Sequence, residues 1–354
     1  MTFETYFRGT RAKLLADLRD LLGRKRERLA ARRPWGSDVL RRLGEFSRRG
    51  KLIRGGLVCL GYEMTGRRLS GAAVRAGTAL ELMQSALLIH DDIMDLDAFR
   101  RGAPALHRQY AEMGGREAVG DADHFGVSMG ICAGEIAIFL AFEALAGLPG
   151  PCRRTVEAQK LFAAEFGLVG LGQMRDIQTG ASPRLIEARE ALDLYRFKTA
   201  RYSFALPLAM GWILGGGAPS VRPKLERLGE HLGLIFQIKD DELGLFGDEA
   251  VLGKPVGSDI RQGKKTLLYL RLVEKAGEKE RRTLAGLFGR PDLTAGDVEV
   301  VRRLARRHAV VDDIRAIMRR YGRRAGTAIR TLPVAAPFRE VLETLLEFSL
   351  ERRS

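Results

Sequence analysis

The chain is poor in cysteine, and its three cysteines form no pattern. Cys59, Cys132 and Cys152 lack the paired spacing of a metal site or a disulfide framework. An odd and sparse count fits a reducing compartment, so we expect all three to be buried as small apolar residues. The N-terminus alternates charged residues with leucine and lacks the apolar core of a secretory signal, so we expect a cytoplasmic protein.

Long uncharged apolar runs are also missing. Spanning a bilayer takes roughly 18 to 20 such residues, and the nearest candidates fall short of that length. "ICAGEIAIFLAFEALAGL" carries Glu135 and Glu143, and "FALPLAMGWILGGG" carries Pro207 and a glycine cluster. We therefore expect two buried helices of a soluble protein and no transmembrane segment.

Basic residues, by contrast, are abundant. A formal net charge of +15 favours, taken alone, a nucleic acid or an anionic membrane surface as partner. The arginines are scattered, however, with acidic residues between them, and no recognisable nucleic-acid module accompanies them. We expect a solvated arginine-rich surface and no nucleic-acid partner; salt-sensitive binding to DNA or anionic vesicles would favour the alternative.

The apolar pattern is helical almost throughout. Apolar residues recur three and four positions apart with charges between them, and alternating strand patterns are scarce. Breaks rich in Gly, Pro, Asp or Ser divide the chain into about ten to twelve helices. No break is long enough for a linker, and no repeat recurs at a fixed period. The sequence therefore predicts one all-α domain over residues 1–354.

A first acidic cluster follows an apolar run in "SALLIHDDIMD". On a helix, Asp91 and Asp95 lie one turn apart on one face, with Asp92 about 100° around. Like charges at this spacing repel, and Mg²⁺ bound by one or two carboxylates together with substrate phosphates would relieve the repulsion. A solvated acidic helix end explains this cluster, taken alone, equally well.

A second acidic cluster changes that balance. "FQIKDDELGLFGD" places Asp240 and Asp241 near the end of another apolar helix, with Asp248 further on. Two such clusters suggest facing walls of one metal-filled cavity. Lysine and arginine are the residues expected around diphosphates. The candidates are Lys51, Arg54, Arg100, Arg101, Lys198, Lys254 and Lys264.

These ordered motifs resemble the trans-isoprenyl diphosphate synthase (polyprenyl synthetase) family between about residues 45 and 270. "DDIMD" followed by "RRG" is similar to its first aspartate-rich motif, "GKLIR" to its homoallylic-diphosphate loop, and "FQIKDD" to its second aspartate-rich motif. "GQMRD" and "KT" fall between them in the expected order. The resemblance implies ten or more helices around a deep central cavity, three Mg²⁺ ions and a homodimer.

The resemblance also assigns roles to individual residues. By it, Asp91 and Asp95 hold two ions and Asp240 the third, supported by Asp92 and Asp241. The allylic diphosphate binds Arg100, Lys198 and Lys254, with Lys264 a further substrate-binding candidate. Isopentenyl diphosphate binds Lys51, Arg54, Gln84 and Arg101. Thr199 and Gln237 stabilise the allylic cation.

The implied reaction is the head-to-tail 1'-4 condensation of isopentenyl diphosphate with an allylic diphosphate. Cleavage of the allylic carbon–oxygen bond leaves a highly charged diphosphate, so metals and cations that grip it lower the barrier. The double bond of the five-carbon substrate then attacks the allylic cation. A closed apolar cavity keeps water away from that cation.

Two positions bear on efficiency and product length. Gly244 stands where the family usually has a third aspartate, and Asp248, one turn further on, is a candidate replacement. By the resemblance, Ala86 and Leu87 form the floor of the product cavity, and neither is aromatic. We therefore predict a twenty-carbon product, with Met83 as a deeper block and fifteen, twenty-five or more carbons as alternatives.

Two other classes share part of this pattern. A class I terpene cyclase has the all-α fold and a metal-binding acidic motif, but it would lack the "GKLIR" loop and the second aspartate pair. A non-catalytic subunit of a heteromeric synthase would lack acidic or cationic residues of the site. Only Gly244 favours that interpretation.

Overall fold

The computed structural model describes residues 1–29, 31–32, 34–248 and 256–352. These described residues form sixteen α-helices, and their only β-structure is one two-stranded antiparallel hairpin. The predicted all-α fold class is confirmed. The helices outnumber the ten to twelve that we expected, partly because short loops divide the last hundred residues into several short helices.

The described residues form two compact units. The N-terminal unit comprises Glu4–Lys160 and Pro207–Gly217, and the C-terminal unit comprises Met1–Phe3, Leu161–Leu206 and Ala218–Ser354. The chain therefore passes between the units four times, and one helix, α7 (Cys152–Ala181), carries residues of both.

In the N-terminal unit, α4 (Gly71–Met94) packs against four other helices. The Ser70 hydroxyl caps α4 by accepting from the Ala73 N–H at 3.3 Å. The apolar residues around Leu80 and Leu82 are fully buried. The remaining elements are α1 (Phe3–Leu29), α2 (Trp35–Arg48), α3 (Ile53–Glu63), β1 (Phe99–Arg100), β2 (Ala103–Pro104), α5 (Leu106–Arg116), α6 (Ala122–Ala146) and α9 (Leu206–Gly215).

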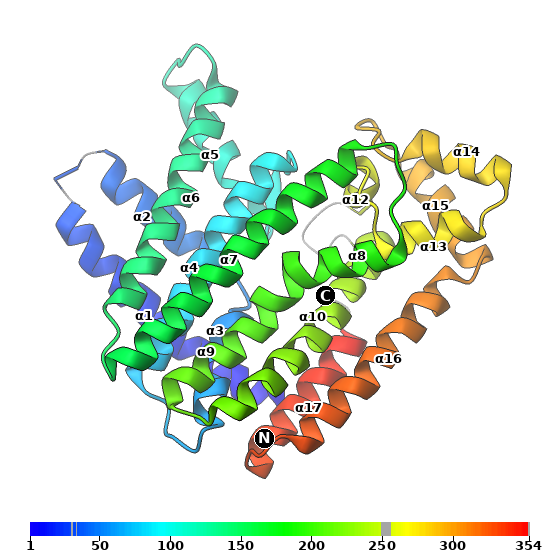
Figure 1. The fold of residues 1–354 in the computed structure, drawn as a ribbon. Coiled ribbons are helices and arrows are strands. Elements are labelled where there is room, and N and C mark those ends of the chain that lie inside the picture. Colours follow the sequence, from blue (N-terminus) through cyan, green and yellow to red (C-terminus); the bar gives the residue numbers. More distant parts are fainter. Residues whose placement is uncertain (30, 33, 249–255, 353–354) are drawn as a thin grey trace. The chain divides into compact units, whose positions relative to one another are not determined.

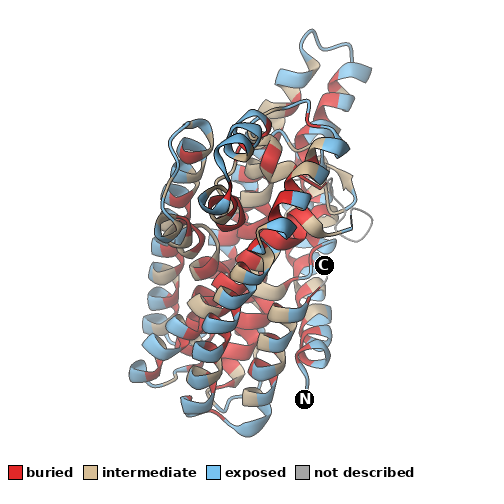
Figure 2. Cartoon of the chain, turned by 90° about the vertical axis from the view of Figure 1, so that its right-hand side faces the viewer, coloured by how far each residue is buried: buried red, intermediate tan, exposed pale blue. Residues whose placement is uncertain are grey.

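In the C-terminal unit, α10 (Arg222–Phe246) packs against several other helices, as α4 does in the N-terminal unit. Among them are α16 (Val310–Thr331) and α17 (Ala336–Glu351) (Figure 1). Leu234, Ile235 and Leu267 belong to its core. The other elements are α8 (Ala188–Tyr195), the π-helix η1 (Arg196–Ala205), the 3₁₀-helix η2 (Pro219–Val221), α12 (Ser258–Arg261), α13 (Leu267–Lys275), α14 (Glu278–Leu287) and α15 (Ala295–Arg307). Figure 2 shows buried residues along helices that are exposed elsewhere on their surface, the amphipathic pattern that the sequence predicts.

Two expectations about burial are wrong. Cys59 is buried, but Cys132 and Cys152 are exposed. Cys132 lies on the outer side of α6, and Cys152 is the first residue of α7. The helix that carries Glu135 and Glu143 is α6, and its outer side exposes Ile131 and Phe139. By contrast, α9 is almost entirely buried, as we expected.

Helix α6 is also the only helix among the described residues that is long and apolar enough to cross a membrane. Only 39% of its most apolar window is buried. Length and composition alone are weak evidence, because a core helix of a soluble protein satisfies the same criteria.

Candidate active site

The first acidic cluster lies at the C-terminal end of α4. Asp91 and Asp92 are in its last turn, and Asp95 is its C-cap residue, whose N–H donates to the Asp91 carbonyl at 2.8 Å. Asp91 and Asp95 are partly exposed, whereas Asp92 is fully buried. The helix therefore offers two accessible carboxylates beside one inaccessible one.

The buried carboxylate is bound by an arginine of the hairpin. Arg100 donates from Nε to Asp92 Oδ1 at 2.6 Å and from Nη2 to Asp97 Oδ2 at 2.9 Å. Burial raises the pKa of Asp92 to about 7, although the Arg100 charge acts in the opposite direction. In this structure Arg100 thus fixes the acidic cluster. The other oxygen of Asp92, Oδ2, is buried without a hydrogen-bond partner among the described residues.

The "GKLIR" motif leads into α3, next to Arg101. Arg101 has a positive φ of 55°, and its Nη1 donates to the Phe46 carbonyl at 2.9 Å. Its guanidinium also packs against Gly50, where a Cβ would lie only 3.0 Å from it. Gly50 therefore makes room for Arg101. Lys51 is exposed and Arg54 is partly buried in the first turn of α3.

Gln84 lies deeper on α4 and is 4% exposed. Its Oε1 is buried and accepts no hydrogen bond from the described residues. Of the residues predicted to set product length, Ala86 and Met83 are buried and Leu87 is partly exposed. Their roles stay predictions.

In the C-terminal unit, α10 presents one stripe of functional residues at intervals of four. A Cβ at Gly229 or Gly233 would collide with the backbone of η1, so the two glycines allow α10 and η1 to pack backbone to backbone. Gln237 and Asp241 follow on the same stripe. The close packing brings these two side chains toward the residues of η1.

A chain of hydrogen bonds joins the predicted residues of η1 and α10. Thr199 Oγ1 donates to Gln237 Oε1 at 2.8 Å, and Gln237 Nε2 donates to Asp241 Oδ1 at 2.9 Å. The Tyr195 hydroxyl donates to the other oxygen of Asp241 and accepts from the Leu267 N–H at 2.7 Å. Burial, and next the charge of Asp259, raise the pKa of Asp241.

The "GQMRD" motif explains the position of Lys198. At Gly172 a Cβ would lie 3.1 Å from the Lys198 backbone nitrogen, so α7 and η1 approach closely there. One turn further along α7, Asp176 forms an ion pair with the Lys198 ammonium. The motif thus holds a lysine beside the Thr199 hydrogen bonds.

Asp240, the exposed neighbour of Asp241, is bound by a residue that the sequence did not point to. Arg352 donates from Nη2 to Asp240 and to the Phe236 carbonyl, the latter at 2.8 Å. The Arg352 side chain is 4% exposed and that of Asp240 is 46% exposed. Nothing in the local sequence of Arg352 marks it, because it lies more than a hundred residues from Asp240.

A second residue missed from sequence is Asp259. Its Oδ2 lies 3.2 Å from the position of a Cβ at Gly244, so a carboxylate stands close to the place of the missing aspartate. The expectation that Asp248 lies one turn along the same helix is wrong, because α10 ends at Phe246. The signal for Asp259 in the sequence was "GSDI", a new helix start after a glycine.

Two predicted cations remain. Lys254 lies outside the described residues. Lys264 is partly exposed, and its backbone N–H donates to the Asp259 carbonyl at 2.9 Å. It therefore lies in the same segment as Asp259.

The donor set fits magnesium held jointly with a diphosphate. Among the described residues, no group of three or more His, Cys, Asp or Glu could hold a metal ion by itself. Mg²⁺ is commonly bound by one or two carboxylates plus substrate phosphates, which asks no such group of the protein. Asp91 and Asp95 on α4, and Asp240 on α10, are accessible carboxylates of the kind that this mode uses.

Comparisons with known proteins agree with this architecture, which is that of the all-α isoprenoid synthases. The family model described as polyprenyl synthetase matches residues 39–305. The chain therefore belongs to the polyprenyl synthetase family.

Three similar proteins illustrate the relationship. A geranylgeranyl diphosphate synthase of Saccharolobus solfataricus is 32% identical over 286 residues, 79% of this chain and 80% of that protein. A short chain isoprenyl diphosphate synthase of Methanothermobacter thermautotrophicus is 35% identical over 306 residues, 86% of each chain. The crystal structure of geranylgeranyl pyrophosphate synthase from Corynebacterium glutamicum, complexed with isoprenyl diphosphate and magnesium, has a TM-score of 0.92, 27% identity and full coverage of both chains.

Proposed function

We propose that this protein is a trans-prenyltransferase that elongates allylic diphosphates with isopentenyl diphosphate and releases geranylgeranyl diphosphate. One observation carries the proposal. In each acidic motif one carboxylate, Asp92 or Asp241, is buried and bonded by protein donors, whereas its neighbour, Asp91 or Asp240, reaches solvent. The names of the relatives support the class of product.

Following the family resemblance, we assign the accessible carboxylates Asp91, Asp95 and Asp240 to three Mg²⁺ ions that bind together with diphosphate. Bound Mg²⁺ supplies charge neutralisation on the leaving diphosphate. Asp92 and Asp241 act differently, because both are buried, Asp92 against Arg100 and Asp241 against Gln237 and Tyr195. Asp92 fixes Arg100 close to the diphosphate site, and Asp241 orients Gln237.

The direction of the hydrogen bonds gives Thr199 its role. Because the Thr199 hydroxyl proton is donated to Gln237, the lone pairs of its oxygen are free to face a developing positive charge. Asp241 accepts from the Gln237 amide, which keeps the amide oxygen turned toward Thr199. Asp241 and Gln237 therefore set the dipole that stabilises the allylic cation.

The cationic residues divide between the two substrates. Lys198, Arg100, Lys254 and Lys264 are assigned to the allylic diphosphate. Lys51, Arg54, Gln84 and Arg101 are assigned to isopentenyl diphosphate. Lys198 is ion-paired with Asp176 in this structure, so it reaches a diphosphate by exchanging one anionic partner for another.

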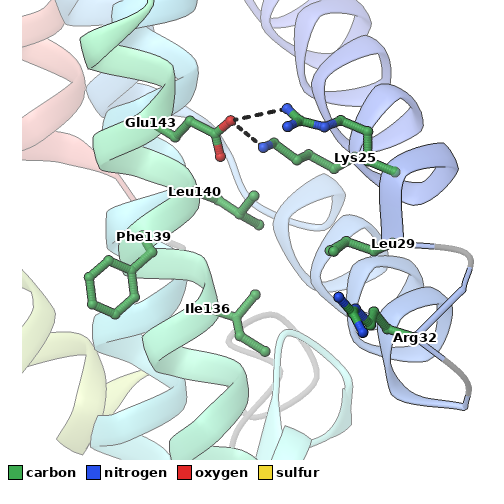
Figure 3. Close-up of a pocket in the computed structure, with 8 residues that line it drawn as sticks. Lys25, Leu29, Arg32, Ile136, Phe139, Leu140 and Glu143 are labelled. Atoms are coloured by element: carbon green, nitrogen blue, oxygen red, sulfur yellow. Dashed lines mark hydrogen bonds and ion pairs between the residues drawn. The ribbon is translucent and has the colours of Figure 1, made fainter.

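We also propose that the chain works as one domain in a cytoplasmic homodimer formed through α6. Its outer side exposes Ile131, Ile136 and Phe139, three large apolar side chains on one helix. Figure 3 shows Ile136 and Leu140 of α6 beside a cavity opposite Leu29 of α1, with Glu143 paired to Lys25 at its rim. A second copy of α6 would cover this apolar surface.

A product assay tests the function. Purified protein is incubated with Mg²⁺, labelled isopentenyl diphosphate and, separately, dimethylallyl, geranyl and farnesyl diphosphates, and chain length is read after phosphatase treatment. We expect a twenty-carbon alcohol from more than one starter, and loss of most turnover in folded Asp91→Ala and Asp240→Ala. A fifteen-carbon product would contradict only the predicted product length, whereas no elongation from any starter would refute the proposed reaction.

A further inference from the structure

Glu81 is a buried carboxylate in the middle of α4 that none of the sequence motifs includes. It is 4% exposed and accepts from the Gly55 N–H at 2.8 Å. Helices α3 and α4 meet closely at this point, because a Cβ at Gly77, one turn before Glu81, would lie 2.8 Å from the Gly55 carbonyl oxygen. The carboxylate is thus inserted at the beginning of α3, directly after the "GKLIR" loop.

Part of the role of Glu81 is to cap α3. The N-cap residue Leu52 has no side chain that can accept a hydrogen bond and is itself in the left-handed region, with φ 54°. The first N–H groups of a helix lack intrahelical acceptors. Glu81 accepts from one of them across the helix contact, which a neutral amide oxygen would do equally well.

The charge of Glu81 needs a different explanation. Burial raises its pKa, and the two cations that oppose this effect are Arg54 and Arg101. Burial lowers the pKa of Arg101, with a smaller contribution of the same sign from Arg54, while the charge of Glu81 acts in the opposite direction. The charge of one buried carboxylate therefore acts on both guanidinium groups, and removing it would leave their positive charge uncompensated.

We propose that Glu81 is a positioning residue that keeps Arg54 and Arg101 together as one preformed binding fork for the diphosphate of isopentenyl diphosphate. The inference rests on the proposed function, which assigns both arginines to that substrate. Arg101 is fixed from one side by two contacts. Its guanidinium donates to the Phe46 carbonyl and packs closely against Gly50. Glu81 offsets the repulsion between the arginines until the diphosphate arrives, so less reorganisation accompanies binding.

The test separates the charge of Glu81 from its capping role. Glu81→Gln retains an oxygen that accepts from Gly55 but removes the charge. We expect the KM for isopentenyl diphosphate to rise about tenfold or more, as the loss of a charge-assisted contact implies, while the KM for the allylic substrate changes less than about twofold. Calorimetric binding of isopentenyl diphosphate without allylic substrate gives a readout independent of turnover and should weaken in parallel.

Asp17→Asn is the matched control. Asp17 accepts from Arg75 of the same helix α4, from Nε at 2.8 and 3.0 Å and from Nη2 at 2.8 Å, and it belongs to no predicted site. We expect this variant to change thermal stability but neither KM. Equal changes in both KM values of E81Q, or an unchanged affinity for isopentenyl diphosphate in folded E81Q, would overturn the inference.

Glu81→Asp covers the case in which E81Q does not fold. The shorter side chain retains the charge and gives up reach, so we expect a smaller rise in the KM for isopentenyl diphosphate alone; parallel changes in both KM values would again contradict the role. The wild-type protein separates the two levels of the argument. If it elongates and E81Q behaves like it, only the role of Glu81 fails, whereas a wild type that neither binds nor consumes isopentenyl diphosphate refutes the function itself.

Discussion

Arg352, at the end of α17, is bonded to Asp240, the carboxylate that we assign to a metal ion. Its guanidinium lies 3.6 Å from the centroid of the Phe236 ring, one turn before Asp240 on α10. Arg352 is buried, so the contact belongs to the packed structure of the C-terminal unit. A cation at Asp240 would have to share or displace this arginine.

Removal of Arg352 should therefore change the magnesium requirement. In Arg352→Gln we expect the Mg²⁺ concentration for half-maximal activity to fall about two- to fivefold, because one charge-assisted competitor is lost. A titration with Mg²⁺ in the elongation assay, together with direct binding of Mn²⁺, measures the shift. Arg339→Gln, also on α17 but bonded to the Leu332 and Val334 carbonyls, is the control. Identical titrations of wild type and R352Q would contradict this prediction.

Asp259 should matter more for turnover than Asp248. In Asp259→Asn we expect kcat to fall about tenfold to a hundredfold, since a charged group near the second acidic motif is lost. The same substitution at Asp248, which lies beyond the end of α10, should leave kcat within about threefold of wild type. Steady-state kinetics at saturating Mg²⁺ compare the two variants. A larger effect at Asp248 would show that the residue replacing the missing aspartate is not Asp259.

Product length should respond to volume at Ala86. Ala86→Phe places an aromatic ring at a fully buried position of α4, and we expect the main product to shorten from twenty to fifteen carbons. Overpacking costs about 1–3 kcal/mol of stability, so thermal unfolding is measured alongside chain length. Ala86→Ser, which adds little volume, should retain the wild-type product. A folded A86F protein that still makes twenty carbons would exclude Ala86 from the cavity floor.

The proposed dimer predicts a charge-sensitive surface on α6. Phe139 is 68% exposed, and Phe139→Glu should convert the dimer to a monomer by placing a charge in an apolar contact. Light scattering after size-exclusion chromatography measures the mass. Leu185→Glu, at a 46% exposed leucine in the loop before α8, should leave the mass unchanged. A monomeric wild type would remove the basis of this prediction.

Periodicity was enough to predict the all-α class, and the family resemblance named Thr199, Gln237 and Asp241, which the structure joins by hydrogen bonds. Contacts between distant parts of the chain were beyond that reasoning. The role of Glu81 can be recognised only from the contact between α3 and α4. That of Arg352 can be recognised only from the packing of α17 against α10. Neither position differs in its local sequence from an ordinary helical residue.

Other errors came from applying a helix beyond its end or from ignoring which side of it is covered. Asp248 was counted along a helix that stops at Phe246. Cys132 was taken as a buried small apolar residue from the sparse cysteine count, although that side of α6 is exposed. Composition shows how apolar a helix is, but the elements packed against the helix determine which of its sides is buried.

The π-helix η1 (Arg196–Ala205) changes the helical register of the residues that follow it. A hydrogen bond to the fifth residue instead of the fourth inserts one extra residue into the turn, and one residue corresponds to about 100° of rotation in an α-helix. Residues before and after η1 therefore follow different helical wheels. Deleting a single residue between Arg196 and Ala205 would restore a regular wheel while turning Lys198 and Thr199 away from their partners on α7 and α10.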